Sequence, residues 1–270
     1  MKKLITLTVA FLSSFLLKAQ DASFYYQKGL DAVNIANYLD AVRYFTSAIT
    51  EDQTLKEAWY NRARAKSEIG NYEGAIADYS VAINLDTNFT AAWLNRGVEK
   101  NEAGDREGAI ADYSKAISLA PKYAKAYYNR GVVYYRLGQY GKALADFSIA
   151  AKENPQMVDA WYNKGLSEMR LGLYQIAVQN ITHAIELNPA QAKFYKYRGI
   201  LFMRMCQYES AQKDLTKATF LSPDDCEAFQ WLGALRLEMN KGAEAEIYFA
   251  KARTLGCVIV KNMEEMVVQL

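Results

Sequence analysis

A segment of 34 residues recurs seven times along this chain without insertion or deletion, and it constrains the fold more than any other feature. If Trp93 is placed at position 4 of the repeat, positions 20 and 27 are alanine in all seven copies. Position 8 is glycine in six copies and Ala63 in the other, and the four prolines of the chain all fall at position 32. Self-similarity with a fixed period of this length predicts a solenoid, in which each repeat packs mainly on its neighbours.

Each repeat contains two successive amphipathic helical patterns. In the copy at residues 90–123 they cover about 91–102 and 106–119. Gly104 lies between them, and three other repeats have glycine at the same position, where a positive φ can end a helix. Gly97 and the alanines are small, so we expect two helices to approach closely there. The terminal proline cannot continue the second helix and predicts its end.

These residues resemble the tetratricopeptide repeat, which combines an early aromatic residue, a glycine, alanines, a late aromatic residue and a final proline. The early aromatic is Trp59, Trp93, Tyr127 or Trp161, and the late one is Tyr79, Tyr113, Phe147 or Phe249. Ile181 and Leu215 depart from the late position, and the first, second and seventh repeats lack the proline. The resemblance implies an all-α fold, a right-handed superhelical solenoid of seven helix-turn-helix repeats with a concave groove.

The resemblance covers residues 22–259. The expected repeats are 22–55, 56–89, 90–123, 124–157, 158–191, 192–225 and 226–259. Residues 260–270 continue the register, and Val260, Met263, Val267 and Leu270 form one apolar stripe. We expect a capping helix there, because the end of a solenoid exposes apolar surface. A docking helix for another protein is the alternative.

Residues 1–19 have the order of a secretory signal peptide. Two lysines precede an apolar stretch from Leu4 to Leu17, and Ala19 is a small residue suited to cleavage. The stretch is short for a membrane span, so we expect cleavage near Ala19 and a periplasmic or secreted protein, with an uncleaved anchor as the alternative. We expect no integral membrane span elsewhere in the chain.

Charge and residue types restrict the function. The formal charge of +2 becomes −1 without Lys2, Lys3 and Lys18, so the composition does not favour nucleic acid as a partner. The single histidine, His183, provides neither a metal site nor a catalytic pair. The sequence contains no phosphate loop and no nucleophile motif. We therefore expect no enzyme activity and no cofactor or metal.

Two positions change together along the repeats. Where position 7 is arginine, position 23 is aspartate, as in Arg62 with Asp78. The other three pairs are Arg96 with Asp112, Arg130 with Asp146, and Arg198 with Asp214. Both positions are equally far from the turn at position 15, so they lie side by side in an antiparallel hairpin. We predict an ion pair within each of these repeats; a basic stripe for an anionic ligand is the alternative.

Two columns are candidates for binding a peptide. Position 6 faces the groove in the family, and here it carries Asn61, Asn95, Asn129 and Asn163. An amide offers a donor and an acceptor to a peptide backbone, and the column resembles the asparagine ladder of O-linked N-acetylglucosamine transferase. Bonds between adjacent repeats are the alternative role. Position 13 carries Arg136, Arg170 and Arg204, a basic edge suited to acidic partners or a merely solvated face.

These columns favour a protein-interaction scaffold that binds an extended segment of a partner. The alternative function is glycan binding or association with an envelope polysaccharide, with the tyrosines of position 5 as stacking platforms. Those residues are Tyr26, Tyr60, Tyr128 and Tyr162.

The three cysteines leave one question open. Cys226 and Cys257 fall at the same end of the seventh hairpin, and Cys206 falls in the opposite turn of the sixth. A disulfide between Cys226 and Cys257 would form in an oxidising compartment. We expect two free thiols instead, with the disulfide as the alternative.

Overall fold

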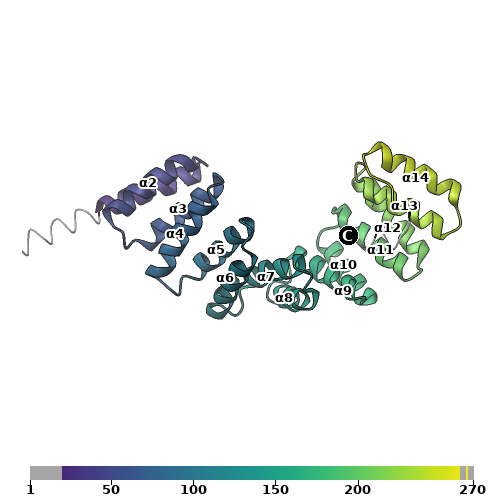
Figure 1. Ribbon diagram of the computed structural model, residues 1–270, viewed down its shortest axis with the longest axis horizontal. Helices are drawn as coiled ribbons and strands as arrows, with labels where there is room; N and C mark the ends of the chain where they lie inside the picture. Colours follow the sequence, from purple (N-terminus) through teal and green to yellow (C-terminus); the bar gives the residue numbers. More distant parts are fainter. Residues whose placement is uncertain (1–19, 262–265, 267–270) are drawn as a thin grey trace, which may run out of the picture. The chain divides into compact units, whose positions relative to one another are not determined.

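The computed structural model describes residues 20–261 and Met266. Residues 20–34 are helical, and further helices follow in pairs along the chain (Figure 1). They are α2 (Tyr38–Glu51), α3 (Lys56–Glu68), α4 (Tyr72–Leu85), α5 (Thr90–Glu102), α6 (Arg106–Leu119), α7 (Ala124–Arg136), α8 (Tyr140–Glu153), α9 (Val158–Arg170), α10 (Tyr174–Leu187), α11 (Ala192–Arg204), α12 (Tyr208–Leu221), α13 (Cys226–Glu238) and α14 (Gly242–Thr254). The predicted all-helical repeat fold is confirmed.

The chain divides into two compact units, one up to Val133 and one from Tyr134. In the first unit, α3 packs on α4 and α5 on α6, while α2 with α3 and α4 with α5 join consecutive repeats. In the second unit, α9 packs on α10, α11 on α12 and α13 on α14, and successive pairs again touch through α10 with α11 and α12 with α13. Each unit is therefore a stack of helical hairpins.

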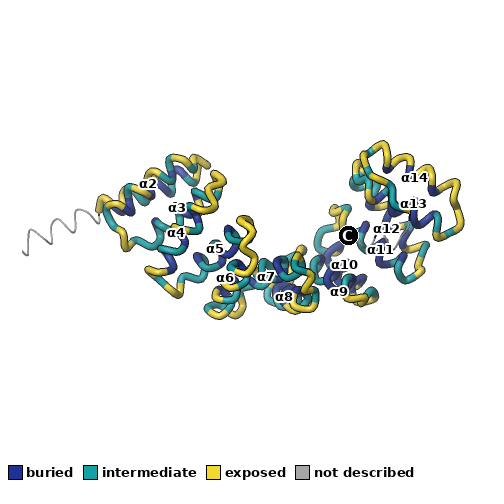
Figure 2. Tube along the Cα trace, viewed as in Figure 1, coloured by how far each residue is buried: buried dark blue, intermediate teal, exposed yellow. Residues whose placement is uncertain are grey.

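Buried segments run along the helices of each unit (Figure 2), and the small and aromatic residues of the repeat are among the buried ones. Ala75, Tyr79 and Ala82 of α4 are buried against Ala63 and Ala92 of the flanking helices. A Cβ atom added to Gly97 would lie 2.7 Å from the ring of Tyr113 and 3.3 Å from a backbone carbonyl. Gly97 therefore permits the close approach of α5 and α6, whereas the second repeat accommodates Ala63 at the same position.

The turns between paired helices use the left-handed conformation at position 15. Gly104 has a φ of 88°, and glycine occupies the same position in three other repeats. Ala36, Cys206 and Asn240 take this conformation without glycine, at φ values of 57°, 57° and 59°. An L-residue in this region costs about 1–2 kcal/mol relative to the right-handed one.

Consecutive repeats are also joined by the aromatic residue of position 4. The indole Nε1 of Trp93 donates to the carbonyl of Thr87 at 3.0 Å, and that of Trp161 donates to the carbonyl of Pro155 at 2.9 Å. In each case the acceptor is position 32 of the preceding repeat. The early aromatic therefore helps to stack neighbouring hairpins.

The predicted ion pairs hold the hairpins internally. Nε of Arg62 lies 2.7 Å from Oδ2 of Asp78, and the corresponding distance from Arg96 to Asp112 is 2.8 Å. Arg198 and Asp214 pair likewise at 2.6 Å. These three predictions are confirmed. The fourth pair, Arg130 with Asp146, stays a prediction.

The seventh repeat is closed by a covalent bond. Cys226 at the start of α13 and Cys257 after α14 form a disulfide, with 5.7 Å between their Cα atoms. The expectation of two free thiols was wrong here, because hairpin packing brings both Cα atoms within bonding range. Cys206 is exposed and is a free thiol.

The expected cap is described only in part. Val260 packs against the core around Trp231 and Leu235, and the helical Met266 is buried in the same cluster. Met263, Val267 and Leu270 lie outside the described residues, as does the predicted signal peptide at residues 1–19. Met266, which the predicted stripe did not include, contributes to this contact together with Val260.

Candidate interaction site

Two asparagines of position 6 bind the preceding repeat. Nδ2 of Asn61 on α3 donates to the hydroxyl of Tyr26 at 2.9 Å. Nδ2 of Asn95 on α5 donates to the hydroxyl of Tyr60, also at 2.9 Å. The donor in each bond is position 6 of one repeat, and the acceptor is position 5 of the repeat before it. These two amides therefore stabilise the stacking of hairpins, the alternative role considered for this column.

Asn129 departs from this pattern, and Asn163 makes a bond within its own helix. Position 5 before Asn129 is Leu94, which has no hydroxyl and is buried, and no hydrogen bond of the Asn129 side chain is found among the described residues. Nδ2 of Asn163 donates to the carbonyl of Asp159, within α9, at 2.9 Å. The column is therefore not a uniform ladder, and its binding of a peptide backbone stays a prediction.

The arginines of position 13 separate into a pair and a single residue. Arg170 at the end of α9 and Arg204 at the end of α11 line one pocket of about 410 Å³. Met169 and Ile200 provide apolar parts of its wall. Arg136 is exposed at the end of α7 and does not line this pocket.

Both guanidinium groups in the pocket lie over tyrosine rings of the preceding repeat. Cζ of Arg170 is 5.4 Å from the centre of the Tyr140 ring, and Cζ of Arg204 is 5.5 Å from that of Tyr174. Nη2 of Arg204 also donates to the Tyr174 hydroxyl at 3.1 Å. Stacking on an aromatic face orients a guanidinium group, and guanidinium groups bind anions.

The electrostatics of the pocket favour an acidic group. Nε of Arg170 is buried and has no hydrogen-bond partner in the described part of the chain. Burial raises the pKa of Tyr135, and its hydrogen bond with Arg170 opposes that shift. A guanidinium group binds a carboxylate through two parallel hydrogen bonds, so this pocket is chemically suited to aspartate or glutamate side chains.

Within residues 20–261, no cluster of three or more metal-binding side chains is present.

The tyrosines that hold these arginines were not among the predicted site residues. Tyr140 and Tyr174 both occupy position 17, one repeat before the arginine that stacks on them. In these two steps along the chain, arginine at position 13 follows tyrosine at position 17 of the previous repeat. Comparing columns between successive repeats, rather than within one repeat, would have found the pair.

The tyrosines of position 5 are used in packing. Tyr162 is only 7% exposed, and its ring centre lies 4.9 Å from that of Phe194. Tyr60 packs in the same way at 4.8 Å from Phe89. The Tyr162 ring is too buried to stack on a sugar, and the half-buried Tyr60 ring is used in packing, so their geometry gives the glycan alternative no support.

Four tetratricopeptide repeat profiles match, at residues 26–89, 99–138, 124–157 and 158–191. Together these matches span more than half of the chain. The chain belongs to the tetratricopeptide repeat family. A comparison with curated protein sequences finds no match.

Solved structures show the same fold. A tetratricopeptide repeat protein from Parabacteroides merdae is 22% identical, with a TM-score of 0.66 over 92% of this chain and 98% of its own. YrrB, described as a TPR protein with an unusual peptide-binding site, is 24% identical, with a TM-score of 0.62 over 68% of this chain and 95% of its own. The MamA protein is 25% identical, with a TM-score of 0.59 over 64% of this chain and 95% of its own.

Among the described residues, no helix is long and apolar enough to cross a membrane. Tetratricopeptide repeat proteins are generally non-catalytic scaffolds, and no feature of the site described above indicates catalysis.

Proposed function

We propose that this tetratricopeptide repeat protein is a non-enzymatic scaffold that binds an extended acidic segment of a partner protein. The observation that carries the proposal is the pocket with two tyrosine-stacked arginines, Arg170 and Arg204. Each guanidinium group is held in place before a ligand arrives, which lowers the entropy lost on binding.

The solved relatives support this class of function. YrrB is described as having a peptide-binding site, and it shares the fold of this chain. The proposal differs from general peptide binding in its charge requirement, because carboxylates are the groups that suit paired guanidinium ions.

Binding of a fluorescein-labelled oligoglutamate peptide, measured by fluorescence anisotropy, tests the proposal. Replacing both Arg170 and Arg204 by glutamine should weaken binding about tenfold or more, because hot-spot arginines dominate such interfaces. Arg136→Gln is the matched control, since it removes an arginine from the same repeat position outside the pocket. Equal effects of the control and the double variant would show general charge attraction and would contradict a specific site.

We propose further that the protein acts outside the cytoplasm. The support is the signal-like order of residues 1–19 together with the disulfide between Cys226 and Cys257, because disulfides persist in oxidising compartments. Mass spectrometry of the protein from its native cells should find a chain that starts after Ala19. Without reductant, a maleimide reagent should label Cys206 alone. An intact amino terminus, or three labelled cysteines, would contradict this location.

A further inference from the structure

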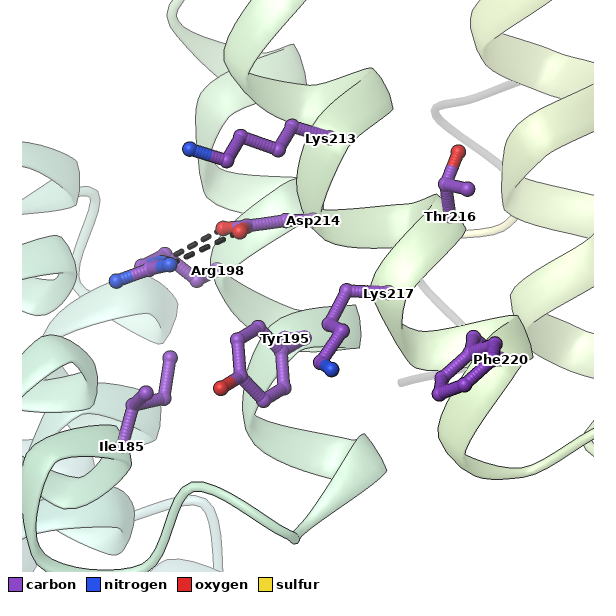
Figure 3. Close-up of a pocket in the computed structure, with 8 residues that line it drawn as sticks. All are labelled: Ile185, Tyr195, Arg198, Lys213, Asp214, Thr216, Lys217 and Phe220. Atoms are coloured by element: carbon purple, nitrogen blue, oxygen red, sulfur yellow. Dashed lines mark hydrogen bonds and ion pairs between the residues drawn. The ribbon is translucent and has the colours of Figure 1, made fainter.

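A second pocket lies in the sixth repeat, where α11 and α12 face the end of α10 (Figure 3). Its volume is about 660 Å³, within the range of roughly 300–1,000 Å³ that is usual for ligand sites. Ile185 and Tyr195 provide apolar wall, and the ion pair of Arg198 with Asp214 lies beside them. This pocket shares no residue with the one that contains Arg170 and Arg204.

Phe220 is the unusual residue of this pocket. It occupies position 29, and its side chain is 74% exposed at the end of α12. The other six repeats have polar residues at this position: Thr50, Asn84, Ser118, Lys152, Glu186 and Thr254. Because six of the seven hairpins fold with a polar residue there, repeat packing does not require an aromatic ring. The exposed ring of Phe220 therefore needs an explanation outside the fold.

Two lysines of the same helix line this pocket, and one of them lies beside the ring. Lys213 and Lys217 are one helical turn apart and both are exposed, and Nζ of Lys217 is 5.1 Å from the centre of the Phe220 ring. In Figure 3, Lys217 lies between Tyr195 and Phe220. No ion pair joins either lysine to a carboxylate among residues 20–261. Since Arg198 is neutralised by Asp214, the pocket carries two uncompensated positive charges.

We infer that the pocket between α11 and α12 is a second docking site, for an acidic segment of a partner protein that carries one aliphatic or aromatic side chain. The apolar side chain packs against Phe220, Tyr195 and Ile185. Acidic residues on either side of it pair with Lys213 and Lys217. Complementary charge selects the partner, and burial of the exposed ring provides affinity. The scaffold would then hold two partner segments on separate sites.

A short fluorescein-labelled peptide, with one leucine flanked on both sides by glutamates, is the probe for this site. Anisotropy is measured on the purified protein and again on the Arg170→Gln, Arg204→Gln variant. In this variant the first site is removed, so the signal reports binding at the second site. In the Arg170→Gln, Arg204→Gln background, Phe220→Ser, which restores the residue type of the third repeat, should weaken binding about tenfold or more. Ile247→Ser is the matched control, because Ile247 is 69% exposed on α14 and lies outside the pocket.

A separate variant tests whether binding at this pocket depends on its two lysines. Lys213→Gln with Lys217→Gln should weaken binding about fivefold and reduce its dependence on salt, because exposed charge pairs are screened. A probe with serine in place of leucine should bind about tenfold more weakly than the leucine probe. The inference is overturned if Phe220→Ser matches Ile247→Ser, if the serine probe binds equally well, or if neither probe binds. Binding of phosphatidylserine vesicles in place of the peptide would also overturn it.

Discussion

The ion pair between Arg198 of α11 and Asp214 of α12 offers a quantitative test of how each hairpin is held together. Nε and Nη2 of Arg198 donate to the two carboxylate oxygens at 2.6 and 2.9 Å. The side chains are only 18% and 5% exposed. Nη1 of Arg198 also donates to the hydroxyl of Thr182 in the preceding repeat at 3.0 Å. Both charges are therefore largely removed from water, and each depends on the other.

The second repeat provides a matched comparison within the same chain. Arg62 pairs with Asp78 in the same geometry, but Nζ of Lys66 is also 2.7 Å from that carboxylate. The position of Lys66 is taken by Phe202 in the sixth repeat. Replacing Arg62 therefore leaves Asp78 paired with Lys66. Replacing Arg198 leaves Asp214 with no cation among the described residues.

We expect Arg198→Leu to lower the free energy of unfolding by about 3–5 kcal/mol, the usual cost of leaving a buried charge without its partner. Arg62→Leu should cost less, about 1–3 kcal/mol, because Lys66 still compensates Asp78. Adding Asp214→Leu to Arg198→Leu should recover most of the loss, since an apolar pair of similar volume replaces a buried ion pair at little cost.

Urea denaturation followed by tryptophan fluorescence measures these differences. Hydrogen exchange of the α11 and α12 amides reports the local change, because repeat proteins need not unfold in one step. The argument is refuted if Arg198→Leu and Arg62→Leu cost the same, or if the double variant is no more stable than Arg198→Leu alone.

Three other substitutions test particular contacts. Asn95→Ala should cost about 1 kcal/mol through its lost bond to Tyr60, whereas Asn129→Ala should change the unfolding free energy by less than about 0.5 kcal/mol; equal losses in urea denaturation would contradict the inter-repeat role. Cys206→Gly should raise stability by about 0.5–1 kcal/mol, because it relieves a positive φ, and a lower melting temperature would argue against strain. Burial raises the pKa of Glu99 above 4.5, so its contribution to stability is present below that pH and is lost as pH rises through the folded pKa. Glu99→Gln should therefore flatten the fall in stability as the pH rises above 4.5, and an unchanged pH profile in urea denaturation would count against that reasoning.

Features that depend on one hairpin could be predicted from the sequence. The period places two helices and a turn in each repeat, and Gly104 occupies the left-handed turn position as expected. Arg62 and Asp78 could be paired because they lie symmetrically about that turn. Within an antiparallel hairpin, sequence distance from the turn sets which residues are neighbours, so no knowledge of the rest of the fold is needed.

Contacts between hairpins were decided by the tertiary structure. From the sequence, the Asn95 side chain could bind either a ligand or the adjacent repeat. In the folded protein it donates to the hydroxyl of Tyr60 in the preceding repeat. The stacking of Arg170 on the ring of Tyr140 is likewise a contact between repeats. The sequence placed Cys226 and Cys257 at one end of a hairpin, but only the packed helices bring their Cα atoms to 5.7 Å. Such contacts depend on the rotation and spacing of neighbouring helices, to which a repeating pattern of residue types is insensitive.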